Sequence, residues 1–470
     1  MSQRASVFSK DPIFAPEILA EIIGHLADLF ATDTNGQMAK MDEMKKLAVV
    51  SKTMCSIART HIFATIRLPS GEILHNLANL LRSNPRIGAA VQSMSYYLCK
   101  DTLNNPDILP FFELKNVTFL YAIHSGFRTP NADSGPTTLC PTTLLDKYLN
   151  PSTGSPSLKV LVVDNLVNLN HKKFVLSQSL ESLVLINCSF THDNLSLLPA
   201  NIDSKPNSQL KSLTLSFTNI PLALLRECSV LEELQIFTRG PTFICPEDTN
   251  INIGSQDSDS SPALPSLKRL ESYSMTQLED DEVIDNTPYD VQHPQFPFLM
   301  KHCPYLEQLS LTISGGGPSL AYPNHNQLKI LNVEWTRLQS ADRFLEEQIE
   351  LLSSLQVPAL EKISLSVAHI SAYIRNSAQA KRFQRRFRAG AGDLGRVIGD
   401  RDYVRFPSLK SFSLRLKMTR HVQVRRGWIP LMISRDEMKR ELDVFVKELG
   451  RGSLGFEFNN ELIVEDDTMQ

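Results

Sequence analysis

The stretch Leu180-Glu-Ser-Leu183-Val-Leu185-Ile-Asn-Cys188 contains the pattern that decides the fold. Leu183 and Leu185 are separated by one residue, and this period of two is typical of a short strand with one buried face. Leu180 would turn inward just before the strand, and Cys188 would close the turn after it. One such strand buries little apolar surface by itself, so the pattern predicts neighbouring copies that stack in parallel.

The same pattern, Leu-x-x-Leu-x-Leu or a close apolar variant, occurs nine times in the chain. The spacings between the first leucines are 22, 30, 21, 36, 39, 22, 32 and 49 residues. Spacings of about 20–29 residues are typical of leucine-rich repeats, and the longer ones require insertions. The nine copies begin at Leu158, Leu180, Leu210, Leu231, Leu267, Leu306, Leu328, Leu360 and Leu409, and two looser copies begin at Val91 and Leu114.

These repeats predict an α/β fold, an irregular solenoid with parallel strands on its concave side and helices and loops on its convex side. Short amphipathic helical runs precede two of the strands, at 221–228 and 298–303. The alternative is an ordinary α/β domain with several buried parallel strands. The expected parts are a solenoid over 69–430, insertions near 125–157, 239–265, 279–297 and 371–405, a capping helix and strand over 431–464, and an acidic tail over 465–470.

The amino-terminal segment, residues 12–68, lacks the repeat and has a helical period instead. Ile18, Ile22 and Leu26 recur every four residues, so a helix here would carry an apolar stripe along one side. Pro16 and Glu17 suit its first turn. The expected order is this first helix, a polar loop over 27–43 and a second helical run over 44–58.

This segment resembles an F-box, the helical module of fungal F-box proteins that carry leucine-rich repeats. Two positions differ from the family pattern, because Phe14-Ala15 stands in place of Leu-Pro and Met54 in place of Trp. A plain helical cap on the end of the solenoid is the alternative. The matching residues are Glu17, Ile18, Leu19, Ile22, Ile23, His25, Leu26, Leu47, Val50, Ser51, Lys52, Ala58, Ile62, Phe63, Ile66 and Leu68.

The resemblance implies a substrate-recognition subunit of an SCF-type cullin–RING ubiquitin ligase. In that family the F-box binds a Skp-type adaptor, and through it the cullin, while the repeats hold a protein substrate. The subunit itself is not an enzyme, because the ubiquitin-conjugating enzyme carries out the catalysis. Two alternatives are a leucine-rich-repeat scaffold unconnected with ubiquitin and an enzyme in an atypical α/β fold. The residues expected to contact the adaptor are Phe14, Pro16, Ile18, Leu19, Ile22, Leu26, Leu47, Val50 and Met54.

Residues that alternate with the leucines are expected to face the concave side and to bind the substrate. Phe237 and Tyr273 are the expected anchors, because aromatic side chains dominate the energetics of protein interfaces. Glu334 and Arg415 would add charged contacts. Because this face carries both signs of charge, the sequence does not name the chemistry of the substrate.

Composition and motifs exclude several other functions. The chain has 470 residues and a formal charge of −3, which is unlike a polycation that coats nucleic acid. The seven cysteines are odd in number and widely spread, which favours reduced thiols over a disulfide framework. No run of about 18 apolar residues predicts a membrane span, and no secretory signal is recognisable. The expected location is therefore the cytoplasm, the nucleus or both.

No motif for catalysis, a cofactor or a metal ion stands out. Gly390-Ala-Gly392-Asp-Leu-Gly395 matches the pattern of dinucleotide-binding loops. That interpretation requires a preceding strand, whereas a basic helical run at 375–388 precedes it here. The basic run is either a solvated helix face or a nuclear-localisation signal.

Overall fold

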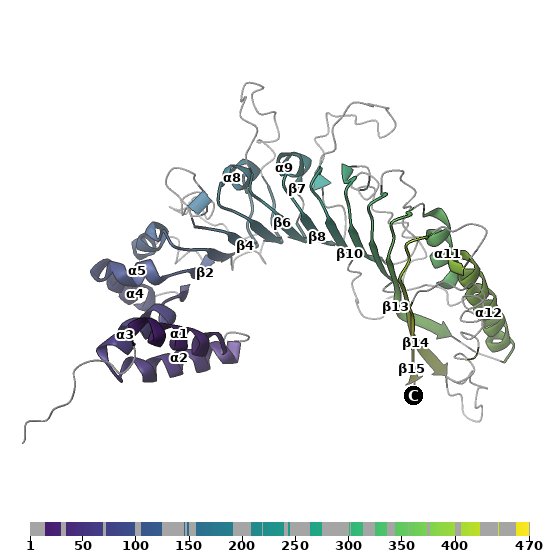
Figure 1. The fold of residues 1–470 in the computed structure, drawn as a ribbon, viewed down its shortest axis with the longest axis horizontal. Helices are drawn as coiled ribbons and strands as arrows, with labels where there is room; N and C mark the ends of the chain where they lie inside the picture. Colours follow the sequence, from purple (N-terminus) through teal and green to yellow (C-terminus); the bar gives the residue numbers. More distant parts are fainter. Residues whose placement is uncertain are drawn as a thin grey trace, which may run out of the picture. The chain divides into compact units, whose positions relative to one another are not determined.

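A computed structural model gives the arrangement of the chain (Figure 1). The chain divides into two compact units, Met1–Leu183 and Val184–Gln470, which are described separately. The expected insertion at 279–297, most of those at 125–157 and 239–265, and nearly all of the expected helix in 431–464 lie outside the described residues. The structure describes residues 15–29, 34–68, 72–98, 105–124, 145, 148–149, 157–190, 208–218, 220–238, 243–244, 264–274, 300, 302–313, 325–335, 344–355, 357–373, 377–399, 406–423, 440 and 457–469.

The first unit begins with three helices that share a small core. Ile23, Met44 and Ala58 form this core, and each is at most 2% exposed. Leu47, Met54 and other half-buried residues pack around it. The three helices are α1 (Pro16–Leu29), α2 (Thr34–Ala48) and α3 (Lys52–Ile62).

The sequence-based boundaries of these helices are wrong in two places. The polar loop expected over 27–43 is mostly helix, because α1 continues to Leu29 and α2 begins at Thr34. Threonine and asparagine are common at helix starts, and good helix formers follow from Gln37 onward. The single helix expected over 44–58 is interrupted, because the Ser51 Oγ accepts a hydrogen bond from the backbone N–H of Met54 at 3.1 Å and thereby caps a new helix.

Four parallel strands of the first unit follow one another in chain order. β1 lies within the residues expected to be a separate helical module, yet it pairs with β2, so the sheet begins earlier than predicted. The loose repeat at Leu114 is displaced by three residues, because Val117 and Leu120 occupy the positions of Val91 and Met94. The strands are β1 (Thr65–Leu68), β2 (Ser93–Leu98), β3 (Phe119–His124) and β4 (Val160–Asp164).

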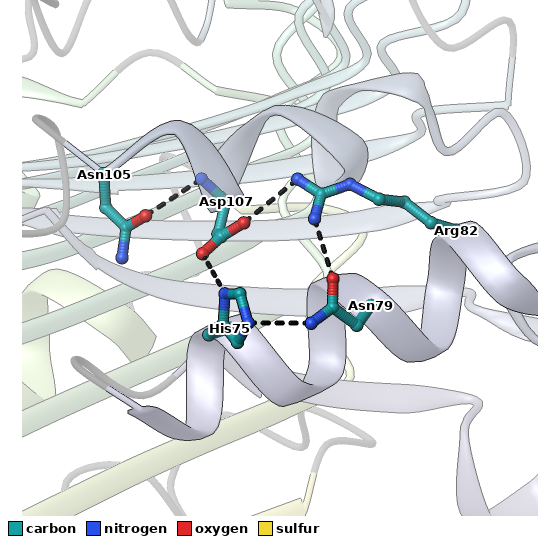
Figure 2. A network of polar contacts seen from close by, with 5 residues as sticks. All are labelled: His75, Asn79, Arg82, Asn105 and Asp107. Atoms are coloured by element: carbon teal, nitrogen blue, oxygen red, sulfur yellow. Dashed lines mark hydrogen bonds and ion pairs between the residues drawn. The ribbon is translucent and has the colours of Figure 1, made fainter.

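Among the described residues, short helices connect these strands or follow them, and a polar network ties two of the helices together (Figure 2). Asp107 accepts hydrogen bonds from His75 Nδ1 at 2.6 Å and from Arg82 Nη2 at 3.0 Å. Asn79 donates to His75 Nε2 at 2.8 Å and accepts from Arg82, so Nδ1 is the ring nitrogen of His75 that donates to Asp107. The helices are α4 (Glu72–Ser83), α5 (Pro85–Ala90), the 3₁₀ helix η1 (Pro106–Glu113) and α8 (His171–Leu176).

β5 (Ser182–Ile186) spans the boundary between the two units in the sequence. In the second unit, eight further parallel strands again follow chain order. All nine predicted repeat copies form strands. The eight strands are β6 (Ser212–Ser216), β8 (Glu233–Thr238), β10 (Arg269–Ser274), β11 (Gln308–Ile313), β12 (Ile330–Trp335), β13 (Lys362–Tyr373), β14 (Ser411–Gln423) and β15 (Glu457–Met469).

The repeat leucines form the core, as their alternation predicts. Leu213 and Leu215 in β6, for example, are fully buried, while the residues that alternate with them are half-buried. The turn after β5 is closed at Cys188, whose backbone N–H donates to the Thr218 Oγ1 at 3.0 Å. β7 (Ile220–Pro221) and β9 (Phe243–Ile244) pair with each other outside the main sheet.

Helices of the second unit lie on one side of its strands (Figure 1). α9 (Leu222–Glu227) confirms one of the two expected helical runs, and α11 (Phe344–Ser354) packs against α12 (Ser377–Gly399). The glycines of the Gly-x-Gly-x-x-Gly pattern lie within α12, so they form no phosphate-binding loop. Gly390 serves helix packing instead, since a Cβ there would lie 3.0 Å from the Cβ of Leu345.

The carboxyl-terminal strands are longer than the repeat pattern predicts. β14 extends to Gln423, and β15 extends to Met469, through most of the residues expected to be an acidic tail. The two strands pair over this whole length, from Ser411 to Gln423 and from Glu457 to Met469. In the parts of the chain that are described, no helix is both long enough and apolar enough to cross a membrane.

A ladder of alternating charge accompanies the strands. The residue after the first leucine of each repeat is in turn Lys, Glu, Lys, Glu, Lys, Glu, Lys, Glu and Lys. Four neighbouring pairs form ion pairs with N–O distances of 2.7 to 3.4 Å. The members of the charge ladder are Lys159, Glu181, Lys211, Glu232, Lys268, Glu307, Lys329, Glu361 and Lys410.

Candidate docking surfaces

The first candidate surface is an apolar stripe on α1, formed by Ile18, Ile22 and Leu26. These side chains are 47%, 45% and 37% exposed. Their spacing of four residues places them on one side of the helix, whereas Ile23 points into the core. Three large aliphatic side chains exposed in a row are typical of a surface that a partner covers.

Two valines between α2 and α3 add to the exposed apolar surface of this module. Val50 is 65% exposed, as expected of an adaptor contact, and Val49 is 85% exposed. Val49 was not predicted from the sequence. Its exposure depends on the break between α2 and α3, which the sequence did not reveal. In the continuous helix that was expected, this valine could have faced the core.

The other residues predicted to contact the adaptor differ in their positions. Pro16 is exposed at the first position of α1, and Leu19 is half-buried. Leu47 and Met54 are half-buried and pack against the three-helix core, so they support the module from within. Phe14 lies outside the described residues.

The second candidate surface is the open face, meaning the face of β6 to β14 that carries Gln235 and the residues in register with it. Among the described elements, no helix covers this face in Figure 1. All four residues predicted to bind the substrate lie in one row across it, here called the aromatic row. This row consists of Ser216, Phe237, Tyr273, Thr312, Glu334, Ser366 and Arg415.

Two aromatic rings are stacked within the aromatic row. The ring centroids of Phe237 and Tyr273 lie 4.5 Å apart, and the ring planes differ by only 5°. Partial burial is the main cause that raises the pKa of the Tyr273 hydroxyl, and its hydrogen bond to the Glu271 carboxylate raises this pKa further. The phenol therefore stays neutral and remains a hydrogen-bond donor at physiological pH.

A second row on the open face, here called the polar row, lies two residues earlier along each strand. Hydrogen bonds join five of its members in two groups. Thr214 Oγ1 donates to Gln235 Oε1 at 3.2 Å and Gln235 Nε2 donates to Glu271 Oε2 at 3.0 Å, while Asn332 Nδ2 donates to Ser310 Oγ at 3.1 Å. The Tyr273 hydroxyl donates to the same Glu271 oxygen at 3.0 Å. The row consists of Thr214, Gln235, Glu271, Ser310, Asn332, Ser364 and Ser413.

Two of the four described thiols are completely shielded from solvent. Cys228 and Cys303 are fully buried, and burial raises the pKa of each thiol to about 12. A thiol with so high a pKa is a weak nucleophile at neutral pH. Within the described residues, no group of three or more His, Cys, Asp or Glu side chains is placed to hold a metal ion.

The described part of the basic run, residues 377–388, lies in α12, as its helical pattern predicted. Lys381, Arg382 and Arg385 are exposed on this helix, while Phe387 is buried and anchors it. Comparison with known proteins adds no identification, since neither a protein-family model nor a curated protein matches the chain.

Proposed function

We propose that this protein is the substrate-recognition subunit of an SCF-type cullin–RING ubiquitin ligase. The proposal assigns the helical module α1–α3 to a Skp-type adaptor and the open face of the repeats to a protein substrate. The observation that carries it is the exposed stripe of Ile18, Ile22 and Leu26, on a module whose core is complete without these residues.

The energetics of the apolar stripe support a docking role. Covering a large aliphatic side chain that is about half exposed contributes on the order of 1 kcal/mol. Three such residues, with Val49 and Val50 nearby in sequence, therefore provide several kcal/mol once a partner excludes water from them. Charged residues are depleted at the centre of protein interfaces, and the stripe contains none.

The mechanism of such a subunit is a high effective concentration. The protein forms and breaks no covalent bond, and it holds the substrate near an activated ubiquitin carried by the partner enzyme. A continuous sheet face suits this role, because it offers a bound segment one preformed surface. A ligase subunit of this class would act in the cytoplasm or the nucleus.

Co-purification with a Skp-type adaptor tests the proposal. We expect the wild-type chain to retain the adaptor and the Ile22→Asp variant to lose it. Leu176→Asp is the matched control, because Leu176 is a large apolar residue on α8 that is 55% exposed. If the wild type retains no adaptor, the scaffold unconnected with ubiquitin becomes the better account.

A further inference from the structure

We infer that the open face between β10 and β12 binds an arginine side chain of a protein partner. The inference deepens the proposed function by naming the chemistry of its substrate, and it rests on that function only in treating the repeats as the binding part. It stands on three residues, Glu271, Tyr273 and Glu334.

Tyr273 presents one uncovered aromatic face. Its ring lies 4.5 Å from that of Phe237, which is close to the separation of about 4.8 Å between neighbouring strands. The two rings therefore stack along the direction from strand to strand, and the second face of Tyr273 is turned toward β11. The residue of β11 in this row is Thr312, whose side chain is too short to cover a ring.

The uncovered face of Tyr273 lies between two carboxylates, those of Glu271 and Glu334. Oε2 of Glu271 already accepts two hydrogen bonds, whereas its Oε1 accepts none from the described residues. Glu334 lies two strands beyond Tyr273 in the aromatic row and is half-buried. Its carboxylate makes no hydrogen bond or ion pair within the described part of the chain. Ser310 and Thr312 are the short residues between the two acids.

The charge of this region is not balanced by its own residues. From β6 to β12, neither the aromatic row nor the polar row contains lysine or arginine. Two cations flank this region on the open face. Arg269 lies one row earlier, and its Nη1 donates to the Glu233 Oε1 at 2.9 Å, while Arg415 lies in the aromatic row two strands beyond Glu334. The complement of two carboxylates beside a bare aromatic face is a cation.

Arginine fits this surface better than lysine. A planar guanidinium stacks on a tyrosine ring and can donate two parallel hydrogen bonds to one carboxylate, whereas an ammonium does neither as well. Stacked on Tyr273 above Thr312, the guanidinium would point toward Glu334. The competing occupant is a second copy of this chain, which would offer Lys381, Arg382 and Arg385 of α12.

Fluorescence anisotropy with the full chain tests the inference. The probes are labelled twelve-residue peptides of glycine and serine that contain two arginines, or two citrullines or two glutamates in their place. Citrulline keeps the shape of arginine and removes its charge. We expect the arginine peptide to bind about tenfold more tightly than the citrulline peptide.

Variants locate the binding to the named residues. Glu334→Gln and Tyr273→Leu should each weaken binding of the arginine peptide about fivefold. Glu307→Gln removes the same charge from the charge ladder, just before the neighbouring strand β11, and should change binding less than twofold. Circular dichroism confirms folding, and Glu334→Gln keeps the test valid if Tyr273→Leu does not fold.

Four results would overturn the inference. They are equal binding of the arginine and citrulline peptides, an equal effect of Glu307→Gln and Glu334→Gln, tighter binding of the glutamate peptide, and self-association of the chain that Glu334→Gln abolishes. The last result would assign the face to a second copy. The peptide assay needs no adaptor. Failure of the arginine inference can therefore be told apart from failure of the proposed function, which would show as adaptor binding that Ile22→Asp does not change.

Discussion

Glu307 and Lys329 occupy the same position in neighbouring repeats, and Lys329 Nζ lies 3.0 Å from Glu307 Oε2. The same position alternates in sign through all nine repeats, so consecutive repeats carry opposite charges there. A repeat that slipped or exchanged places with its neighbour would bring like charges together. We interpret the charge ladder as a device that favours the native order of the strands.

The first prediction concerns this charge ladder. Glu307→Lys replaces the attraction to Lys329 by repulsion. It also creates a run of three positive charges in the ladder, at positions 268, 307 and 329. We expect the free energy of unfolding to fall by about 1 kcal/mol at low salt, since exposed pairs contribute modestly. Chemical denaturation at low salt and at about 1 M salt measures the loss, which screening should reduce.

A compensating variant controls for the size of the new side chain. Glu307→Lys combined with Lys329→Glu restores opposite charges between these two residues and should recover part of the loss. Destabilisation of the double variant equal to the sum of the single variants would show that the charges do not interact.

The second prediction compares two helical glycines. Gly24→Ala should raise the free energy of unfolding by about 0.5–1 kcal/mol, because a Cβ there meets no atom within 4 Å and alanine favours helix. Gly390→Ala should lower it by about 1 kcal/mol, because α11 and α12 would have to separate at Leu345. Thermal or denaturant unfolding measures the free energy of unfolding of both variants. An equal increase in both would refute close packing at Gly390.

The third prediction concerns pH. The hydrogen bond from His75, and then that from Arg82, hold the pKa of Asp107 below its usual value. A lowered folded-state pKa means that ionised Asp107 stabilises the fold above the unfolded-state pKa, and that this stability is lost as the pH falls through the folded-state value. Asp107→Asn should therefore be less stable than wild type near pH 6, and the gap should close below about pH 4. A gap that is independent of pH would exclude this charge effect.

The fourth prediction concerns the aromatic stack. A double-mutant cycle of Phe237→Ala and Tyr273→Ala should give a coupling free energy of about 0.5–1.5 kcal/mol in unfolding experiments. Tyr273→Ala with Ser366→Ala is the control cycle, since Ser366 lies three strands away in the same row. Equal coupling in both cycles would show that the rings do not stabilise each other.

The repeat strands could be predicted because their leucines alternate at the period that a one-sided strand requires. Leu183 and Leu185 are buried in β5, as predicted. The loose repeat copy was placed three residues too early, at Leu114, because two possible apolar patterns overlap there. Only the pairing of β3 with β2 shows that the copy begins at Val117. β1 was missed for a related reason, since four residues are too short to show a period.

The shared face of the residues proposed to bind the substrate could be predicted, because alternation assigns Phe237 and Tyr273 to the same face. Their stacking depends on the register between β8 and β10, which the 36-residue spacing does not reveal. The charge ladder was visible in the sequence at one fixed repeat position. The Asp107 network was not, because it joins residues 25 and 32 positions apart on two helices.

A titration of purified Skp-type adaptor into the purified full-length chain tests the central claim most directly. Calorimetry should show one-to-one binding to the wild type and to Leu176→Asp, and a dissociation constant at least about tenfold weaker for Ile22→Asp, equivalent to about 1.4 kcal/mol. Absence of binding to the wild type, or equal affinity for Ile22→Asp, would contradict the assignment of this protein to a ubiquitin ligase.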